Sequence, residues 1–213
     1  MYDLLPPWPL LSAFLIASLV RAVTPGPGVL YIIARSLAQG RQAGLASVAG
    51  VALGNLGNAL LAAWGLAALF ALSSLAFLVV KFGGALYLVY LGIRTLRGSH
   101  RVITQATPAD HGHAFRDGVL VALLNPKTMV FFAAFLPQFM TTAAPAAWQA
   151  MTLGSLFVAI ALITDTIYAL AAASILPQLD RSEGIRALAR RLSGSLLIGL
   201  GVMAAWMDTR VAR

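Results

Sequence analysis

Asp165 is the first of a few ionisable side chains whose place in the sequence would allow them to bind a charged ligand or a proton. It falls inside the apolar stretch from Trp148 to Leu176, and we expect no other carboxylate to lie as deep in an apolar stretch. A charge there costs at least about 2.5–3.5 kcal/mol to place in a membrane, so it should face a partner or a wet cavity. Asp165 is therefore predicted to bind a substrate ammonium group or a proton. The alternative is a fixed ion pair with an arginine that only holds helices together.

Two basic side chains lie beside proline-containing breaks in apolar stretches. Arg21 precedes the first break by one turn, and Lys127 directly follows Pro126 at the second. A guanidinium binds a carboxylate well through paired donors. Arg21 is thus predicted to hold a substrate carboxylate, and with Asp165 it would match the two ends of a zwitterion. The alternatives for Arg21 are an ion pair with Asp165 or a side chain that extends to the membrane interface. Lys127 either balances negative charge in the site or lies near the cytoplasmic face of the membrane.

The breaks themselves indicate where a binding site lies. Proline cannot donate a backbone hydrogen bond, and glycine does not favour a helix. Backbone freed by such a break is tolerated at membrane depth only where protein buries it or water reaches it, and secondary transporters build substrate sites there. Helices that restart after a break can also offer amide groups to an anion. The candidate substrate-binding residues are Thr24, Pro25, Gly26, Pro27, Gly28, Asn55, Asn125, Pro126 and Lys127, with Asp165 and Arg21 as candidates for ion coupling.

The composition places these residues in a membrane protein. Of the 213 residues, 60% are hydrophobic and 10% are charged, and the mean hydropathy is +0.84. A soluble domain carries roughly 25% charged residues. The net charge of +8 comes from basic residues in short loops and does not indicate nucleic-acid binding. Cysteine is absent, which excludes disulfides, thiol catalysis and cysteine-ligated metals. The first residues lack a basic n-region, so the first apolar run is expected to stay in the mature protein.

The apolar pattern predicts an all-α membrane protein with six transmembrane helices in a single polytopic domain. A spanning helix needs about 20 apolar residues. Between the third and fourth segments we expect a polar loop from Leu96 to Phe115. The segments are about Leu10 to Ala34, Gly44 to Leu69, Leu75 to Thr95, Val119 to Phe139, Trp148 to Leu176 and Leu192 to Met207.

The arginines predict the orientation. They concentrate in the loops after the first, third and fifth segments, and the intervening loops carry none, so the three basic loops should be cytoplasmic and both termini periplasmic. The halves also look alike, because segments one and four carry the breaks. Three segments per half give opposite topology, which predicts two inverted three-helix repeats with broken helices 1 and 4. The first repeat covers about 9–95, the cytoplasmic loop about 96–116 and the second repeat about 117–208.

Three blocks of sequence stand out along the chain. They are Thr24-Pro25-Gly26-Pro27 with Ala34-Arg35-Ser36-Leu37 and Gly40-Arg41-Gln42-Ala43-Gly44, then Lys81-Phe82-Gly83-Gly84 to Gly92, and Asn125-Pro126-Lys127 with Phe131-Phe132 and Phe135 to Phe139. Together the blocks resemble the signatures of the LysE/RhtB family of amino-acid exporters. The resemblance implies an exporter of amino acids or close derivatives in the bacterial inner membrane, driven by an ion gradient. The family often has an acidic residue shortly after the glycine of the second span, where this chain has Asn55 after Gly54.

The function predicted from all this is export of amino acids by proton antiport. The partners are then an amino-acid substrate, protons and the lipid bilayer, with a homo-oligomer left open and no cofactor or nucleic acid expected. An exporter of another small metabolite and a passive channel share the architecture. A structural subunit of a larger complex is a further alternative. An intramembrane enzyme is disfavoured by the absence of an HExxH pattern, of cysteine and of histidine within a span. For His100, Asp110, His111 and His113 a solvated loop is favoured over a metal site.

Overall fold

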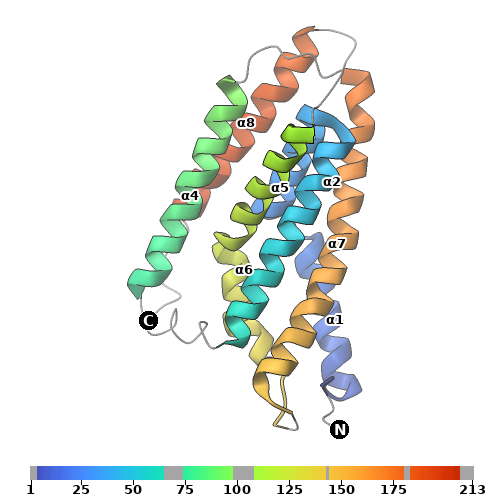
Figure 1. The fold of residues 1–213 in the computed structure, drawn as a ribbon, viewed down its shortest axis with the longest axis vertical. Helices are drawn as coiled ribbons and strands as arrows, with labels where there is room; N and C mark the ends of the chain where they lie inside the picture. The colour runs from blue at the N-terminus through green and yellow to red at the C-terminus, as the bar shows by residue number, and fades with distance from the viewer. Residues whose placement is uncertain (1–3, 65–73, 98–107, 143, 180–182, 207–213) are drawn as a thin grey trace.

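The computed structural model describes residues 4–64, 74–97, 108–142, 144–179 and 183–206, and within these ranges the protein is built from helices (Figure 1). They include two short irregular turns, the π-helical η2 and the 3₁₀ η3. The elements in chain order are α1 (Trp8–Val23), α2 (Pro27–Ala63), α4 (Ser74–Arg97), α5 (Pro108–Leu123), α6 (Pro126–Val130), η2 (Phe131–Phe135), η3 (Leu136–Phe139), α7 (Ala146–Leu179) and α8 (Glu183–Trp206).

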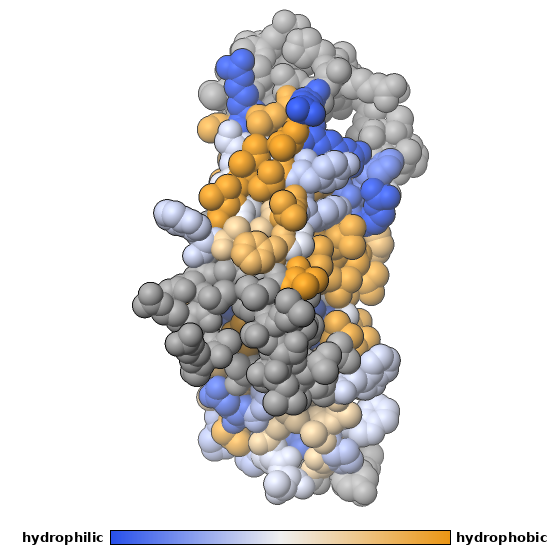
Figure 2. Space-filling view, turned by 90° about the vertical axis from the view of Figure 1, so that its left-hand side faces the viewer, coloured by the Kyte–Doolittle hydropathy of each residue, from blue (hydrophilic) through white to orange (hydrophobic). Residues whose placement is uncertain are grey.

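The surface and the helix lengths fit a membrane protein. Among the described residues, two helices are long and apolar enough to cross a membrane by length and composition: Pro27–Ala63, which is interrupted at Gly40, and Ala146–Ile175. The face drawn in Figure 2 carries hydrophobic side chains along much of its length, and hydrophilic ones gather towards its upper end. Together these features support the prediction of an all-α membrane protein.

The first predicted break is present and is shorter than expected. α1 ends at Val23, Thr24 and Gly26 are extended, and α2 begins at Pro27. Pro27 and Gly28 were expected to lie in the break and instead form the first turn of α2. Proline suits that position because the first amide of a helix has no intrahelical acceptor to lose. The Thr24 hydroxyl donates to the Val20 carbonyl at 2.6 Å, and the Thr24 amide donates to the same carbonyl at 3.0 Å, so both donors of Thr24 close the last turn of α1.

The chain reverses inside α2 at Gly40. Its φ of 83° lies in the left-handed region that favours glycine. A Cβ on Gly44 would meet the Ser36 hydroxyl, although eight residues of straight helix would separate the two by about 12 Å. The two arms of α2, Pro27 to Gln39 and Arg41 to Ala63, therefore lie against each other. The reversal falls inside the predicted loop between the first two spans, but the loop is much shorter than expected, because all of it except Gly40 is helical.

The second half of the chain has longer helices than predicted. α5 begins at Pro108, so the expected polar loop up to Phe115 is wrong over its last part. α8 begins at Glu183 and not near Leu192. A helix satisfies its own backbone hydrogen bonds and can continue past the end of an apolar stretch, which a count of apolar residues does not register. The break at Asn125-Pro126 is confirmed, and α6 restarts at Pro126.

Glycines allow the second arm of α2 to pack closely on α5. A Cβ on Gly54 would lie 2.6 Å from the Val119 carbonyl oxygen, and one on Gly50 would meet the Phe115 carbonyl oxygen. α4 and α8 pair in the same way along one edge of the bundle in Figure 1, with Gly92 against the Gly194 carbonyl oxygen. Small residues at helix interfaces commonly serve this purpose in membranes. Gly83 differs from these glycines, because nothing lies within 4 Å of its Cβ position.

Two apolar clusters fill the bundle. The first contains Tyr31, Ile32, Val51, Ala122 and Leu197 among its buried members. The second is rich in aromatic rings and is formed by Phe14, Phe131, Phe132, Leu136, Phe139, Leu153, Phe157 and other buried residues. The Phe131 and Phe157 rings lie 4.7 Å apart between centroids. Members of both clusters line one small cavity, which therefore lies where the clusters meet.

Candidate functional site

The cavity brings the two helix breaks together. Its volume is about 30 Å³, which is room for roughly two water molecules. α1, α2, α5, α6 and α7 all contribute to its wall. The lining residues are Arg21, Ala22, Gly26, Gly28, Val29, Val51, Asn55, Ala122, Asn125, Thr128, Phe157, Ala161 and Asp165.

The first break gives the cavity the N-terminus of α2. Gly26 is the N-cap and has no side chain with which to cap the helix. The first amides of a helix have no intrahelical acceptor, and here they belong to Gly28 and Val29, which line the cavity. This end of α2 therefore presents donors and a partial positive charge to whatever occupies the cavity.

The second break is closed by its own residues. The Asn125 side-chain oxygen accepts from the Lys127 amide at 3.1 Å, and the Asn125 carbonyl accepts from the amides of Thr128 and Met129 at 3.1 Å each. Asn125 is 6% exposed and also lines the cavity. The expectation that both restarting helices offer amides to a ligand is therefore wrong for Lys127, because Asn125 already occupies that donor.

Two opposite charges from different helices face the same cavity. Arg21 lines it from α1 and Asp165 from α7. Arg21 Nη2 donates to Thr128 Oγ1 at a long 3.4 Å, and Arg21 Nε is buried without a hydrogen-bond partner among the described residues. The ion pairs between described residues do not include one between Arg21 and Asp165. The two side chains thus do not form a close ion pair, which was the structural alternative, although their charges lie near enough to attract each other.

Lys127 completes a positive region at the first break. A Cβ on Gly26 would lie 3.7 Å from Lys127 Nζ and 4.0 Å from Arg21 Nη1. Two cations therefore approach the same glycine, next to the N-terminus of α2. Positive charge on this side of the cavity and a carboxylate on α7 suit a ligand that carries charges of both signs.

Comparison with known proteins gives the family. Residues 19–208 match the family described as LysE type translocators. The chain belongs to the LysE family of translocators. It is 33% identical to a homoserine/homoserine lactone efflux protein of Salmonella typhimurium over 195 residues, which cover 91% of this chain and 94% of the relative. An uncharacterized membrane protein of Vibrio cholerae is 33% identical over 91% of this chain and 95% of its own length. No solved structure matches the chain. The protein is thus a membrane transporter and not an enzyme.

Several residues predicted to bind substrate lie outside the wall of the translocator's cavity. Thr24 and Pro25 are exposed, whereas Pro27 is buried and Pro126 is half-buried, and none of the four lines the cavity. The prolines shape the site because each begins a helix at the break. Asn58 donates to the Ala122 carbonyl at 2.8 Å and so bridges α2 and α5, as expected for an amide between helices.

Other residues of the translocator's cavity were missed from the sequence. Thr128 is 3% exposed, lines the cavity and accepts the hydrogen bond from Arg21. Ala161 lies four residues before Asp165 on α7, so helical periodicity alone places the two on one face. Phe157 lies a further turn away. This spacing was available in the sequence and would have identified the α7 wall.

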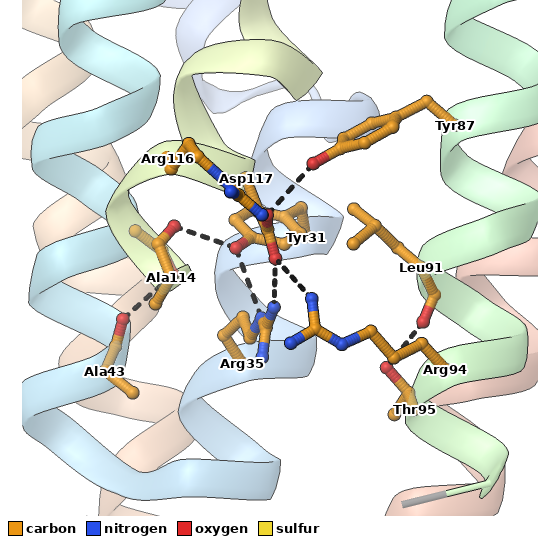
Figure 3. A network of polar contacts seen from close by, with 11 residues as sticks. Tyr31, Arg35, Ala43, Tyr87, Leu91, Arg94, Thr95, Ala114, Arg116 and Asp117 are labelled. Atoms are coloured by element: carbon orange, nitrogen blue, oxygen red, sulfur yellow. Dashed lines mark hydrogen bonds and ion pairs between the residues drawn. The ribbon is translucent and has the colours of Figure 1, made fainter. Parts of the chain in front are cut away.

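Asp117 is the largest omission. Its side chain is 1% exposed, although it lies just before the apolar segment predicted to begin at Val119 and was not considered as a site residue. Arg35 Nη2 donates to its Oδ2 at 2.6 Å, and the Tyr87 hydroxyl donates to its Oδ1 at 3.0 Å (Figure 3). Arg94 and Arg116 each lie 3.7 Å from it. Four basic or polar side chains from α2, α4 and α5 thus surround one buried carboxylate.

Two of the histidines that were expected in a solvated loop lie on a helix instead. His111 and His113 lie on α5, while His100 and the side chain of Asp110 fall outside the described residues. Among the described residues no group of three potential ligands could hold a metal ion.

Proposed function

We propose that this translocator exports amino acids or close derivatives across the bacterial inner membrane in exchange for protons. The observation that carries the proposal is the pair of opposite charges, Arg21 and Asp165, which face one cavity without an ion pair between them. A zwitterion would supply both missing partners at once. The names of the Salmonella relatives, which are efflux proteins for homoserine and its lactone, support this class of substrate.

The positive side of the cavity is suited to the substrate carboxylate. Arg21 offers a fork of donors, the first amides of α2 point to the same space, and Lys127 adds a further charge. On the other side, Asp165 would accept the substrate ammonium, with Asn55 as a further polar group. Apart from Asn125 and Thr128, the rest of the wall is small or apolar, so it is suited to a compact side chain.

Asp165 is also the residue proposed to couple transport to protons. A carboxylate that is 4% exposed needs either a cation or a proton to neutralise it. If the substrate ammonium and a proton compete for Asp165, the carrier releases one only when it takes the other. Exchange of the two across the membrane is the consequence.

The cavity must enlarge during transport. Space for roughly two waters does not hold an amino acid, so the structure corresponds to a closed form of the site. We propose that two inverted repeats, about 9–95 and about 117–208, rock against each other to open it. The basic residues then lie on the cytoplasmic side and both termini on the periplasmic side.

Counterflow in liposomes tests the proposal. Purified protein is reconstituted with unlabelled amino acid inside, and uptake of labelled amino acids and of their lactones is measured with and without a proton gradient. Saturable exchange that the gradient accelerates supports an antiporter. Linear uptake without saturation would indicate a channel, and no exchange by folded protein would mean that another metabolite is the substrate.

A further inference from the structure

Asp117 and its partners Arg35, Tyr87, Arg94 and Arg116 form the Asp117 cluster. The cluster lies beyond the cavity, towards the end of the bundle that carries these arginines, which is called the arginine-bearing end. Arg35 follows the cavity residue Gly28 by seven residues on α2, which is about 10 Å along the helix. Asp117 precedes the cavity residue Ala122 by five residues on α5, about 7.5 Å. The cluster is therefore a second polar centre, separate from the one that faces the cavity.

Its contacts join elements from both halves of the chain. Asp117 lies on α5, and its hydrogen-bond donors Arg35 and Tyr87 lie on α2 and α4. Arg94, also on α4, lies close enough for an ion pair. Arg116, the neighbour on α5, would stay beside Asp117 if α5 moved away from α2 and α4.

The buried Tyr31 lies between this cluster and the cavity in the order of α2, three residues after Gly28 and four before Arg35. Tyr31 is 0% exposed, and its hydroxyl donates to the Ala114 carbonyl at 2.8 Å and accepts from Arg35 Nε at 3.1 Å. The Tyr31 ring belongs to the same apolar cluster as Val51 and Ala122, which form part of the cavity wall. Arg35 thus donates hydrogen bonds to both the Asp117 carboxylate and the Tyr31 hydroxyl, and it holds both in place.

The cluster has a second arrangement available to it. Arg94 and Arg116 are 44% and 65% exposed at the side chain and stay 3.7 Å from Asp117, without a hydrogen bond to it. If the hydrogen bonds from Arg35 and Tyr87 to Asp117 break, Asp117 still has Arg116 beside it. Water can reach Arg94 and Arg116, because both side chains are exposed. A buried carboxylate with a replacement partner can exchange one arrangement for another, whereas one without a replacement would be locked.

We infer that Asp117 is a latch that closes the cavity at the arginine-bearing end, and that its contacts with Arg35 and Tyr87 must break before the cavity opens there. This inference rests on the proposed alternating exposure of the cavity. It assigns a function to a carboxylate that does not touch the substrate, so Asp117 is a positioning residue. Weakening the latch should favour the form that is open at this end.

Thiol labelling tests the latch, because the chain contains no cysteine. Ala161→Cys places one thiol in the cavity wall, and a membrane-impermeant maleimide is applied from either side of vesicles of known orientation. Arg35→Gln in this background should speed labelling from the arginine-bearing side by about tenfold or more, since a charge-assisted hydrogen bond is lost. Labelling from the other side should slow. Arg41→Gln, which removes the same charge from an exposed position on α2, is the matched control and should leave both rates unchanged.

Two further variants keep the inference open to refutation. Tyr87→Phe removes only a hydroxyl and serves where Arg35→Gln fails to fold, and Asp117→Asn should act in the same direction as both. Equal labelling rates in the parent and all latch variants would overturn the inference, as would equal acceleration by Arg41→Gln. Labelling does not depend on the substrate. A shift in labelling without amino-acid exchange would refute the proposed function alone, and exchange without a shift would refute the latch alone.

Discussion

Arg21 and Asp165 line one cavity from α1 and α7, yet they do not form an ion pair with each other. Burying two charges is costly unless partners compensate for lost water. Arg21 has only a long hydrogen bond to Thr128 at 3.4 Å. The protein thus keeps two incompletely satisfied charges beside a polar space, and this arrangement underlies the predictions on transport.

Asp165→Asn should abolish proton-driven transport while the protein still folds. The amide keeps the size of the carboxylate but can neither take up a proton nor pair with an ammonium group. Gradient-driven uptake should fall at least about tenfold. Asp165→Glu, which keeps the charge, should retain more activity than Asp165→Asn. Wild-type rates in Asp165→Asn would remove the role assigned to this residue.

Arg21→Gln should discriminate between substrates with and without a carboxylate. An amino acid should lose affinity by about tenfold or more, because a charge-assisted pair is lost. Its lactone has no carboxylate and should be affected much less. Competition by each compound in the counterflow assay measures the difference, with Arg41→Gln as the control for charge. Equal losses of affinity for both compounds would show that Arg21 does not bind the substrate carboxylate.

The breaks could be predicted from sequence because their chemistry is local. Pro27 and Pro126 cannot accept a preceding helical turn, so each restarts a helix wherever the chain places it. A reversal between Ala34 and Gly44 was expected from the two apolar segments, but its tightness was not, because one glycine among good helix formers gives a weak signal. Tight packing of Gly44 on Ser36 stabilises this turn. Apolar counting also ended helices too early, because polar turns of α5 and α8 extend beyond the apolar stretches.

The site was predicted in part, for a related reason. Deep charges and break residues are visible in the sequence, and Arg21, Gly26, Asn55, Asn125 and Asp165 do line one cavity. Asp117 was not visible, because it neighbours Arg116 in a polar segment and resembles a solvated loop residue. Only the packing of α5 on α2 and α4 buries it. Contacts between distant segments cannot be obtained from one sequence by periodicity alone.

The close packing of α2 on α5 should make Gly50 intolerant of a side chain. A Cβ there would meet the backbone carbonyl of Phe115, which cannot rotate away as a side chain can. Gly50→Ala should destabilise the protein by about 1–3 kcal/mol. Gly83→Ala is the matched control, since nothing lies within 4 Å of its Cβ position and alanine favours a helix by roughly 0.5–1 kcal/mol. Thermal unfolding in detergent compares them. Equal midpoints for both variants would contradict the packing described here.

Asn125→Ala should weaken both the start of α6 and the cavity. The side-chain oxygen of Asn125 caps the Lys127 amide, and loss of such a cap costs about 0.5–2 kcal/mol. Lys127 and Thr128 follow directly, so a frayed start would displace the groups that approach Gly26 and Arg21. Asn125→Ser can still cap the amide and should recover stability.

If Asn125 acts only as a cap, Asn125→Ser should also recover transport. If its amide binds substrate as well, Asn125→Ser should unfold at the wild-type temperature yet show a raised KM. Full activity of Asn125→Ala would exclude both roles.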